Sequence, residues 1–298
     1  MRIKLAALSL VLLLASVLTV YAGEDMVKAR GLWAVDGDTI MVELADGSRK
    51  EVRFISVNAP ELAACLGDEA QTACDALIKG KIIWLELDPE QGMDRRDRNG
   101  RLLAHVFLEP VQTPSAHLGT RLAELGLSRL DIRDPKDTWH EDHFDIHYVP
   151  WVLAAQIEAA KERRGWWGEC DPYRDSDLVI AAIKQWGDDE VVYMVNRGVD
   201  AIDLAKGWKL ASDPKESQTL EFSRYVEALV LPPGWVLRVH SGPVSTSRVG
   251  EYSIRDTEKV IDWYWTGRKM WRNDSDEAWL IWNDQTRYYF SYPLKEWD

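Results

Sequence analysis

The chain has 298 residues, and 46% of them are hydrophobic, which is enough for more than one hydrophobic core, so two domains are expected. The formal net charge is −13. This charge excludes a protein that coats nucleic acid through positive charge alone, so any binding of a polyanion must be local or assisted by a cation.

The first 22 residues have the pattern of a cleavable secretory signal. Arg2 and Lys4 give a basic start, an apolar run extends from Leu5 to Val20, and the small residue Ala22 follows. The run is shorter than a typical membrane span. We therefore expect a secreted or extracytoplasmic protein without stable membrane insertion. A leader that is not cleaved, and that anchors the protein in a membrane, is the alternative.

Residues 23–170 are predicted to form a first domain of short strands interrupted by helices. Strands are predicted at 39–44, 51–57, 81–87 and 101–108, the first two joined by a turn at 45–48. Helices are predicted at 67–79, 116–125 and 151–164, where Gly126 ends the second and Pro150 opens the third. This pattern fits a small closed barrel.

Three cysteines leave one unpaired in an exported protein. Cys74 lies on the apolar face of the predicted helix 67–79, which is typical of a buried thiol. Cys65 and Cys170 are then the expected disulfide. A bridge between Cys65 and Cys74 is an alternative that the sequence leaves open.

Acidic and basic side chains recur in three segments of this first domain: 35–39 (VDGDT), 52–61 (VRFISVNAPE) and 97–104 (DRNGRLLA). Carboxylates can hold a hard divalent cation and poise a water molecule, and arginines can bind a phosphate. Taken singly, each residue has a structural explanation, such as a turn aspartate or a glutamate at a helix entry. Together they predict a site that cuts phosphodiester bonds.

The order and spacing of these segments resemble the thermonuclease family, whose type member is staphylococcal nuclease, from about Leu32 to about Trp167. The resemblance implies an OB-fold barrel. It also implies a calcium-dependent nuclease that hydrolyses DNA, with RNA as an open second substrate, and leaves 3′-phosphate and 5′-hydroxyl ends.

The resemblance also assigns roles to individual residues. Four positions would hold Ca²⁺: Asp38, Asp36, Asn58 and the carbonyl of Ala59. Asn58 stands where the family usually has a carboxylate, so the affinity for Ca²⁺ should be lower. Three positions would be catalytic: Arg53 and Arg101 at the phosphate, and Glu61 as the general base.

Substrate-binding positions match the family less well. Arg98 can replace a basic residue that contacts a terminal phosphate, whereas Asn99 stands in place of an aromatic residue. Ile132 occupies the approximate place of a second aromatic residue. Asp97, four residues before Arg101, is interpreted either as a residue that orients this arginine or as a cap that stabilises the loop, and the structural role is favoured.

A second cluster could bind a transition metal instead. It consists of His140, Glu141, Asp142, His143, Asp145 and His147. Runs of this composition are more often solvated loops. This cluster would not explain the two arginines of the first site.

Residues 171–189 are predicted to connect the domains, with a short helix at 178–186. The region 190–298 is predicted to be a β-sandwich. Its strands are expected at 190–196, 228–231, 235–240, 278–282 and 286–292, the last two joined around Asn283-Asp284.

This second region resembles a lamin tail domain, an immunoglobulin-like sandwich, in the segments 199–210, 231–239 and 271–280. Trp208, Trp235 and Trp279 are interpreted as core residues and not as stacking platforms. The sequence does not identify a ligand for this second region. The alternative function of the protein is a non-catalytic adaptor that binds nucleic acid or protein.

Overall fold

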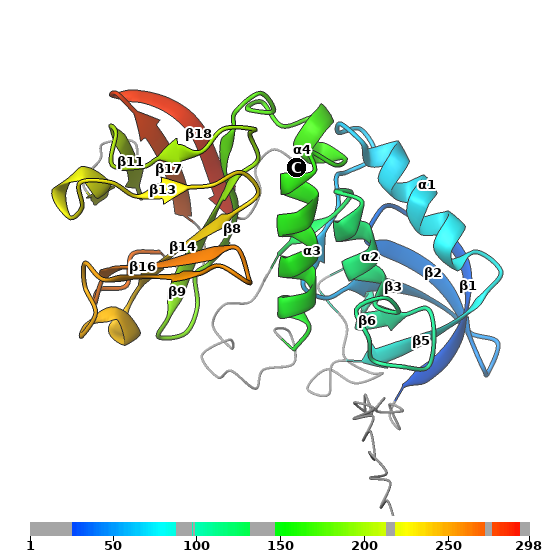
Figure 1. The fold of residues 1–298 in the computed structure, drawn as a ribbon. Coiled ribbons are helices and arrows are strands. Elements are labelled where there is room, and N and C mark those ends of the chain that lie inside the picture. Colours follow the sequence, from blue (N-terminus) through cyan, green and yellow to red (C-terminus); the bar gives the residue numbers. More distant parts are fainter. Residues whose placement is uncertain are drawn as a thin grey trace, which may run out of the picture.

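The structure is a computed structural model, and Figure 1 shows a barrel, a group of helices and further sheets along the chain. It describes residues 26–87, 97, 99–131, 147–212, 218–271 and 276–292. The predicted leader, Arg98 and Ile132 lie outside these residues, as does most of the histidine-rich cluster, of which only His147 is described. Within the described ranges, no helix has the length and apolar character needed to cross a membrane.

The first part of the chain forms a closed barrel with helices packed around it (Figure 1). Its elements are β1 (Val27–Ala34), β2 (Thr39–Leu44), β3 (Arg49–Phe54), β4 (Val57–Asn58), α1 (Gly67–Ile78), β5 (Ile82–Leu87), β6 (Leu102–Phe107), α2 (Leu118–Glu124), β7 (Arg129–Leu130), α3 (Val149–Lys161) and α4 (Trp166–Glu169). The barrel order is β1-β2-β3-β6-β5, which fits the predicted OB fold.

Alternation of side chains along the strands fills the barrel. Ile40 and Val42 of β2, Val52 of β3 and Leu102 of β6 are fully buried in one core cluster. Helix α1 lies close to β1, because a Cβ at Gly31 would lie only 2.4 Å from the carbonyl oxygen of Ile78. Close packing thus holds helix α1 against the barrel.

The predicted strand 51–57 is wrong in its second half. Strand β3 ends at Phe54, and Ser56 has a φ of 65°, so the chain turns there. Residues 57–58 then form β4, which pairs with β7 outside the barrel. This turn brings Asn58 back toward Arg53.

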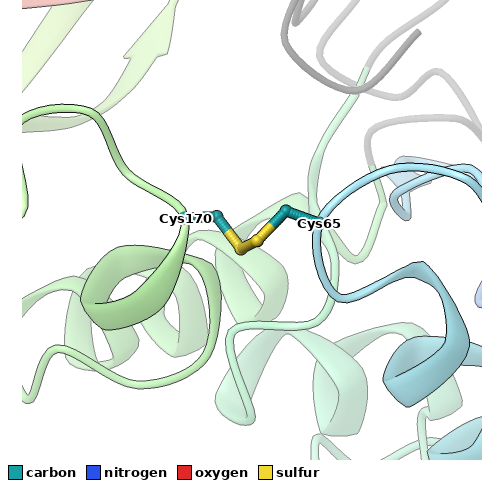
Figure 2. Close-up of a disulfide and its surroundings, with 2 residues drawn as sticks. All are labelled: Cys65 and Cys170. Atoms are coloured by element: carbon teal, nitrogen blue, oxygen red, sulfur yellow. A yellow bond between two sulfur atoms is a disulfide. The ribbon is translucent and has the colours of Figure 1, made fainter.

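The expected disulfide is present between Cys65 and Cys170, with their Cα atoms 6.0 Å apart (Figure 2). It joins the loop before α1 to the residue after α4. Cys74 is a buried free thiol, and burial raises its pKa. The Cys65–Cys74 alternative is therefore wrong.

The described residues of the second part form a five-stranded sheet, β15-β16-β14-β9-β8, a four-stranded sheet, β12-β11-β17-β18, and the two-stranded pair β10-β13. The elements are β8 (Leu178–Lys184), β9 (Glu190–Asn196), β10 (Ile202–Asp203), β11 (Trp208–Ala211), β12 (Thr219–Glu221), η2 (Phe222–Arg224), β13 (Val230–Leu231), β14 (Val236–Ser241), η3 (Pro243–Ser245), β15 (Tyr252–Arg255), β16 (Val260–Thr266), β17 (Asp276–Trp282) and β18 (Gln285–Tyr292). Both sheets contribute to one hydrophobic core.

The helix predicted at 178–186 is wrong, because residues 178–184 form strand β8 at the edge of the five-stranded sheet. Six of its seven residues are buried. A short run that is apolar on both faces has no periodicity, so a buried strand and a buried helix look alike in sequence. Helix α3 covers this strand, and Nε2 of Gln156 donates a hydrogen bond to the carbonyl of Ala181 at 2.5 Å.

Buried charged groups connect the helices to the second part. Arg197 and Asp171 form an ion pair at 3.3 Å whose side chains are fully buried. The guanidinium of Arg129 lies 4.0 Å from the ring of Trp166 and 5.0 Å from that of Phe290 on β18. The barrel, the helices and the C-terminal sheets therefore pack against one another.

His117 is a buried histidine at the start of α2. Nδ1 of His117 accepts a hydrogen bond from the backbone amide of Thr120 at the start of α2, so this nitrogen carries no proton. Burial, together with the neighbouring His105, lowers the pKa of His117 well below its usual value. The ring also lies beside Tyr148, whose hydroxyl donates to Glu86.

We expect the free energy of unfolding to fall as the pH drops below about 6.5, because the unfolded chain then binds a proton at His117 that the folded protein does not. Between pH 6.5 and 5.5 the loss from this group should be about 1 kcal/mol. Urea unfolding at several pH values measures it. His117→Asn keeps a helix-capping acceptor without the titration, so its stability should depend less on pH; an unchanged slope would contradict the assignment.

Candidate active site

An ion pair between Asp38 and Arg53 forms the centre of the candidate site. Asp38 follows the turn between β1 and β2, and Arg53 lies on β3. Nε of Arg53 lies 2.9 Å from Oδ1 of Asp38, and the two residues are only 4% and 5% exposed. The register of the barrel produces this contact, since Thr39 of β2 is directly opposite Arg53.

The remaining donors of Arg53 point at the turn after β3. Nη1 donates to the carbonyls of Phe54 and Val57, each at 2.7 Å, and Nη2 donates to Oδ1 of Asn58 at 2.8 Å. Hydrogen bonds between a guanidinium and fixed carbonyl groups lock its orientation. Arg53 thus holds the turn, Asn58 and Asp38 in one network.

Asp38 also positions the next backbone segment. Its Oδ2 accepts a hydrogen bond from the amide of Ala59 at 2.6 Å. Gly37 makes the approach possible, because a Cβ there would lie 2.5 Å from the Cβ of Ala59 and 2.7 Å from that of Ala70 on α1. The amide of Asp38 itself donates to Oδ1 of Asp36 at 2.9 Å, as in an Asx turn.

Arg101 approaches the same network through Thr39. Its Nη1 lies 3.4 Å from Oγ1 of Thr39, whose hydroxyl donates to Oδ1 of Asp38 at 3.1 Å. The parallel pairing of β3 with β6, in which Arg53 is opposite Leu103, brings this end of β6 alongside β3. The sequence analysis assigned no role to Thr39, although its position in the DGDT segment could have indicated one.

Asp97 fills both of the roles considered for it, because it binds the side chain of Arg101 and the backbone of its own loop. Its Oδ2 accepts from Nε of Arg101 at 2.8 Å and pairs with Nη2 at 2.7 Å, while Oδ1 accepts from the backbone amides of Asn99 and Arg101. Although its partial burial has the opposite effect, these hydrogen bonds lower the pKa of Asp97. Asn99 itself is exposed.

Glu61 lies two residues beyond Ala59, in the loop between β4 and α1, and its side chain is exposed. Its carbonyl accepts a hydrogen bond from the amide of Ala64 at 2.8 Å. Gly67, at the start of α1, packs so closely that a Cβ would lie 2.0 Å from this carbonyl oxygen. The backbone of Glu61 is therefore fixed, while its side chain is exposed.

The donor set beside Arg53 fits a hard cation by its chemistry. A carboxylate, an amide oxygen and a backbone carbonyl, from Asp38, Asn58 and Ala59, are all oxygen ligands, as Ca²⁺ requires. Arg53 already binds the side-chain oxygens of Asp38 and Asn58, so a cation would share them with this guanidinium. Among the described residues, no cluster of three or more His, Cys, Asp or Glu side chains is suited to a metal ion.

The disulfide restrains the loop that carries Glu61, because Cys65 is four residues further along and is bonded to Cys170 across 105 residues of chain (Figure 2). Replacing both cysteines by serine should lower the free energy of unfolding by about 2–5 kcal/mol. Urea unfolding measures the change. Cys74→Ala, which keeps the bridge, is the control. If the double serine variant is as stable as Cys74→Ala, the bridge contributes no more to stability than the buried thiol of Cys74 does.

The chain is similar to known proteins over part of its length. Residues 51–169 match the model of the family described as staphylococcal nuclease homologue. The chain is 37% identical over 119 residues to Endonuclease YncB of Bacillus subtilis (strain 168), covering 38% of this chain and 52% of that protein. It is 32% identical over 117 residues to the SPbeta prophage-derived endonuclease YokF of the same strain, covering 37% of this chain and 36% of that protein.

The region that matches this family model contains most of the candidate site. Arg53, Asn58, Ala59, Glu61 and Arg101 lie inside residues 51–169, whereas both aspartates of the DGDT turn precede them. The chain spans about half of the length of one curated relative and about a third of the other.

Proposed function

We propose that this protein is a calcium-dependent nuclease that hydrolyses phosphodiester bonds of DNA, with RNA as a second substrate, and leaves 3′-phosphate and 5′-hydroxyl ends. The observation that carries the proposal is the network of Asp38, Arg53, Asn58 and Ala59, with the exposed Glu61 two residues further along the chain. The similarity to proteins named as endonucleases supports it.

In this proposal the two arginines bind the phosphate. Arg53 is held by Asp38 and by two backbone carbonyls, and Arg101 is held by Asp97, so both charges are already oriented before substrate binds. Preoriented charges stabilise the extra negative charge that develops on the phosphate oxygens in the transition state. Glu61 takes a proton from the attacking water, because its carboxylate is exposed and its backbone is fixed.

Ca²⁺ would be held by the oxygens of Asp38, Asn58 and Ala59, with Asp36 next to them, and would supply charge neutralisation at the phosphate. Asp36 orients Asp38 through the Asx turn. Asn58 contributes no negative charge to the proposed Ca²⁺ site. A carboxylate at this position should therefore raise the affinity for Ca²⁺.

Asn58→Asp should therefore lower the dissociation constant for Ca²⁺ by about tenfold, since ligand charge sets the affinity of such sites. Isothermal titration calorimetry on the purified protein measures it. Asn99→Asp adds the same charge at an exposed position outside the ligand set and is the matched control. If both variants bind Ca²⁺ equally, Asn58 is not a ligand.

We also propose that the protein is exported and that its second part is a lamin tail-like sandwich of the immunoglobulin type. The leader pattern and the disulfide support export, because disulfides persist in oxidising compartments. Two sheets that share one core support the sandwich.

Digestion of plasmid DNA, single-stranded DNA and RNA, in Ca²⁺ and in chelator, tests the proposed function. Cleavage in Ca²⁺, its loss in chelator, and products that accept a 5′-phosphate from a kinase without prior dephosphorylation are expected. Intact nucleic acid under all conditions would favour the alternative of a non-catalytic adaptor.

A further inference from the structure

A groove lies where the segment 172–178 meets the second part of the chain, away from the candidate active site. Its volume is about 1000 Å³, at the upper end of the range for small-molecule sites. Three further regions contribute to its lining: residues 201–203, strand β11 with the turn before it, and the hairpin between β17 and β18. Nothing in the proposed nuclease function uses this groove.

Aromatic rings form part of the lining. Tyr173, Trp208 and Trp282 line the groove, and Trp282 is 36% exposed. The ring centroids of Trp208 and Trp282 lie 6.1 Å apart, with 31° between their planes. Trp208 was predicted to be a core residue, but it is only half-buried, with one side packed against the core. These rings thus offer a partly accessible apolar surface.

The aromatic surface is held rigidly. Nε1 of Trp282 donates to the carbonyl of Lys206 at 3.0 Å, and the guanidinium of Arg287 lies 4.8 Å from its ring. The following Asn283 and Asp284 both have positive φ, as a two-residue type I′ hairpin loop requires. A surface fixed in this way loses little conformational entropy when a ligand packs on it.

The charges of the groove are unsuited to a polyanion. Asp175, Asp177 and Asp203 outnumber the two cationic residues, Lys206 and Arg287. Lys206 lies 3.7 Å from Asp203, and Arg287 lies against Trp282. Asp177 pairs with Arg163 at 3.2 Å, so the exposed Asp175 is the carboxylate that the groove offers to a ligand. Sites that bind nucleic acid need locally positive charge. Carboxylates beside aromatic faces instead suit a ligand with hydroxyl donors and apolar C–H faces.

We propose that this groove binds neutral oligosaccharides built from hexopyranose rings. The C–H faces of a sugar ring pack on Trp282 and Trp208, and its hydroxyl groups donate to the surrounding carboxylates, Asp175 among them. The size of the groove accommodates a short stretch of a glycan chain. Such a site would hold the protein at a glycan surface independently of the nuclease site.

Isothermal titration calorimetry of the full protein with chitohexaose, cellohexaose and maltohexaose tests the proposal, with the oligonucleotide dT12 as the competing ligand class. At least one of the three sugars should bind, and Trp282→Ala should raise its dissociation constant at least tenfold. Trp282→Phe should lose less. Trp33→Ala is the matched control, because Trp33 is 42% exposed but lies on β1, outside the groove.

Asp175→Asn tests the polar side of the groove at an exposed residue whose replacement should not disturb folding. It should also weaken sugar binding, while thermal unfolding stays unchanged. The proposal is overturned if none of the three sugars binds, or if Trp282→Ala and Trp33→Ala bind them equally. Binding of dT12 that depends on Trp282, without sugar binding, would overturn it in favour of a nucleic-acid site.

Discussion

Replacing Glu61 by glutamine should slow DNA cleavage in Ca²⁺ by about 10²–10⁴-fold, because glutamine has nearly the same shape but cannot accept the proton of the attacking water. The free energy of unfolding should stay within about 0.5 kcal/mol of wild type, since the side chain is exposed. Initial rates on plasmid DNA and urea unfolding measure the two effects separately.

The control for this variant is Glu69→Gln, an exposed glutamate in the first turn of α1 that has no place in the site. It should cleave at the wild-type rate. The pH profile adds a second criterion, because the increase of kcat/KM with pH that a general base produces should be absent in Glu61→Gln. A Glu61→Gln variant as fast as wild type would exclude Glu61 as the base.

Replacing Arg53 by alanine should have the largest combined effect. The change leaves the carboxylate of Asp38 buried without its partner, which should lower the free energy of unfolding by about 3–5 kcal/mol. It also removes a proposed phosphate ligand, so cleavage by the folded fraction should fall by about 10²–10³-fold. Urea unfolding and rates measured well below the melting temperature separate the two losses.

A double-mutant cycle isolates the ion pair itself. Asp38→Ala removes the carboxylate that faces the buried Arg53, whereas the double variant removes both charges. The double variant should therefore be more stable than the sum of the two single losses predicts, by about 1–3 kcal/mol. Additive losses would mean that the pair contributes no coupling. Arg49→Ala is a control, because Arg49 lies on the same strand but is exposed, and its distance to Glu43 is 3.9 Å.

Much of the barrel could be predicted from local patterns. The alternation in Thr39–Leu44 and the apolar run Ile82–Leu87 identify their strands, and glycine and proline mark the ends of α2 and α3. The hairpin at Asn283-Asp284 was predictable for the same reason, because these residues tolerate positive φ. Local chemistry decides each of these features.

The errors lie where the outcome depends on contacts distant in sequence. The sequence of strand β8 shows no hydrophobic periodicity, because the strand is buried on both faces, one of them against helix α3. No local signal in the sequence reports that environment. Strand β16 was not predicted either, and it pairs in parallel with β14 through a long connection. Such pairings follow from the fold as a whole.

The candidate site shows the same division. The residue types at positions 38, 53, 58 and 61 were sufficient to nominate it, but the sequence did not reveal that Asp38 and Arg53 bind each other directly. That contact results from the register between β2 and β3, which sets Thr39 opposite Arg53. The turn at Ser56, which redirects Asn58 toward the arginine, likewise has no strong sequence signal.

Helix α3 has a consequence for how the protein can be divided. Its Gln156 hydrogen-bonds to the amide of Leu130 at 2.6 Å on one side and to the carbonyl of Ala181 on the other. Trp167, fully buried just beyond this helix, belongs to the same apolar cluster as both C-terminal sheets. Truncation after residue 177 would expose that cluster to water, so residues 26–177 should not be stable as a separate fragment. The second part of the chain is likewise not an independent unit that could be exchanged for another.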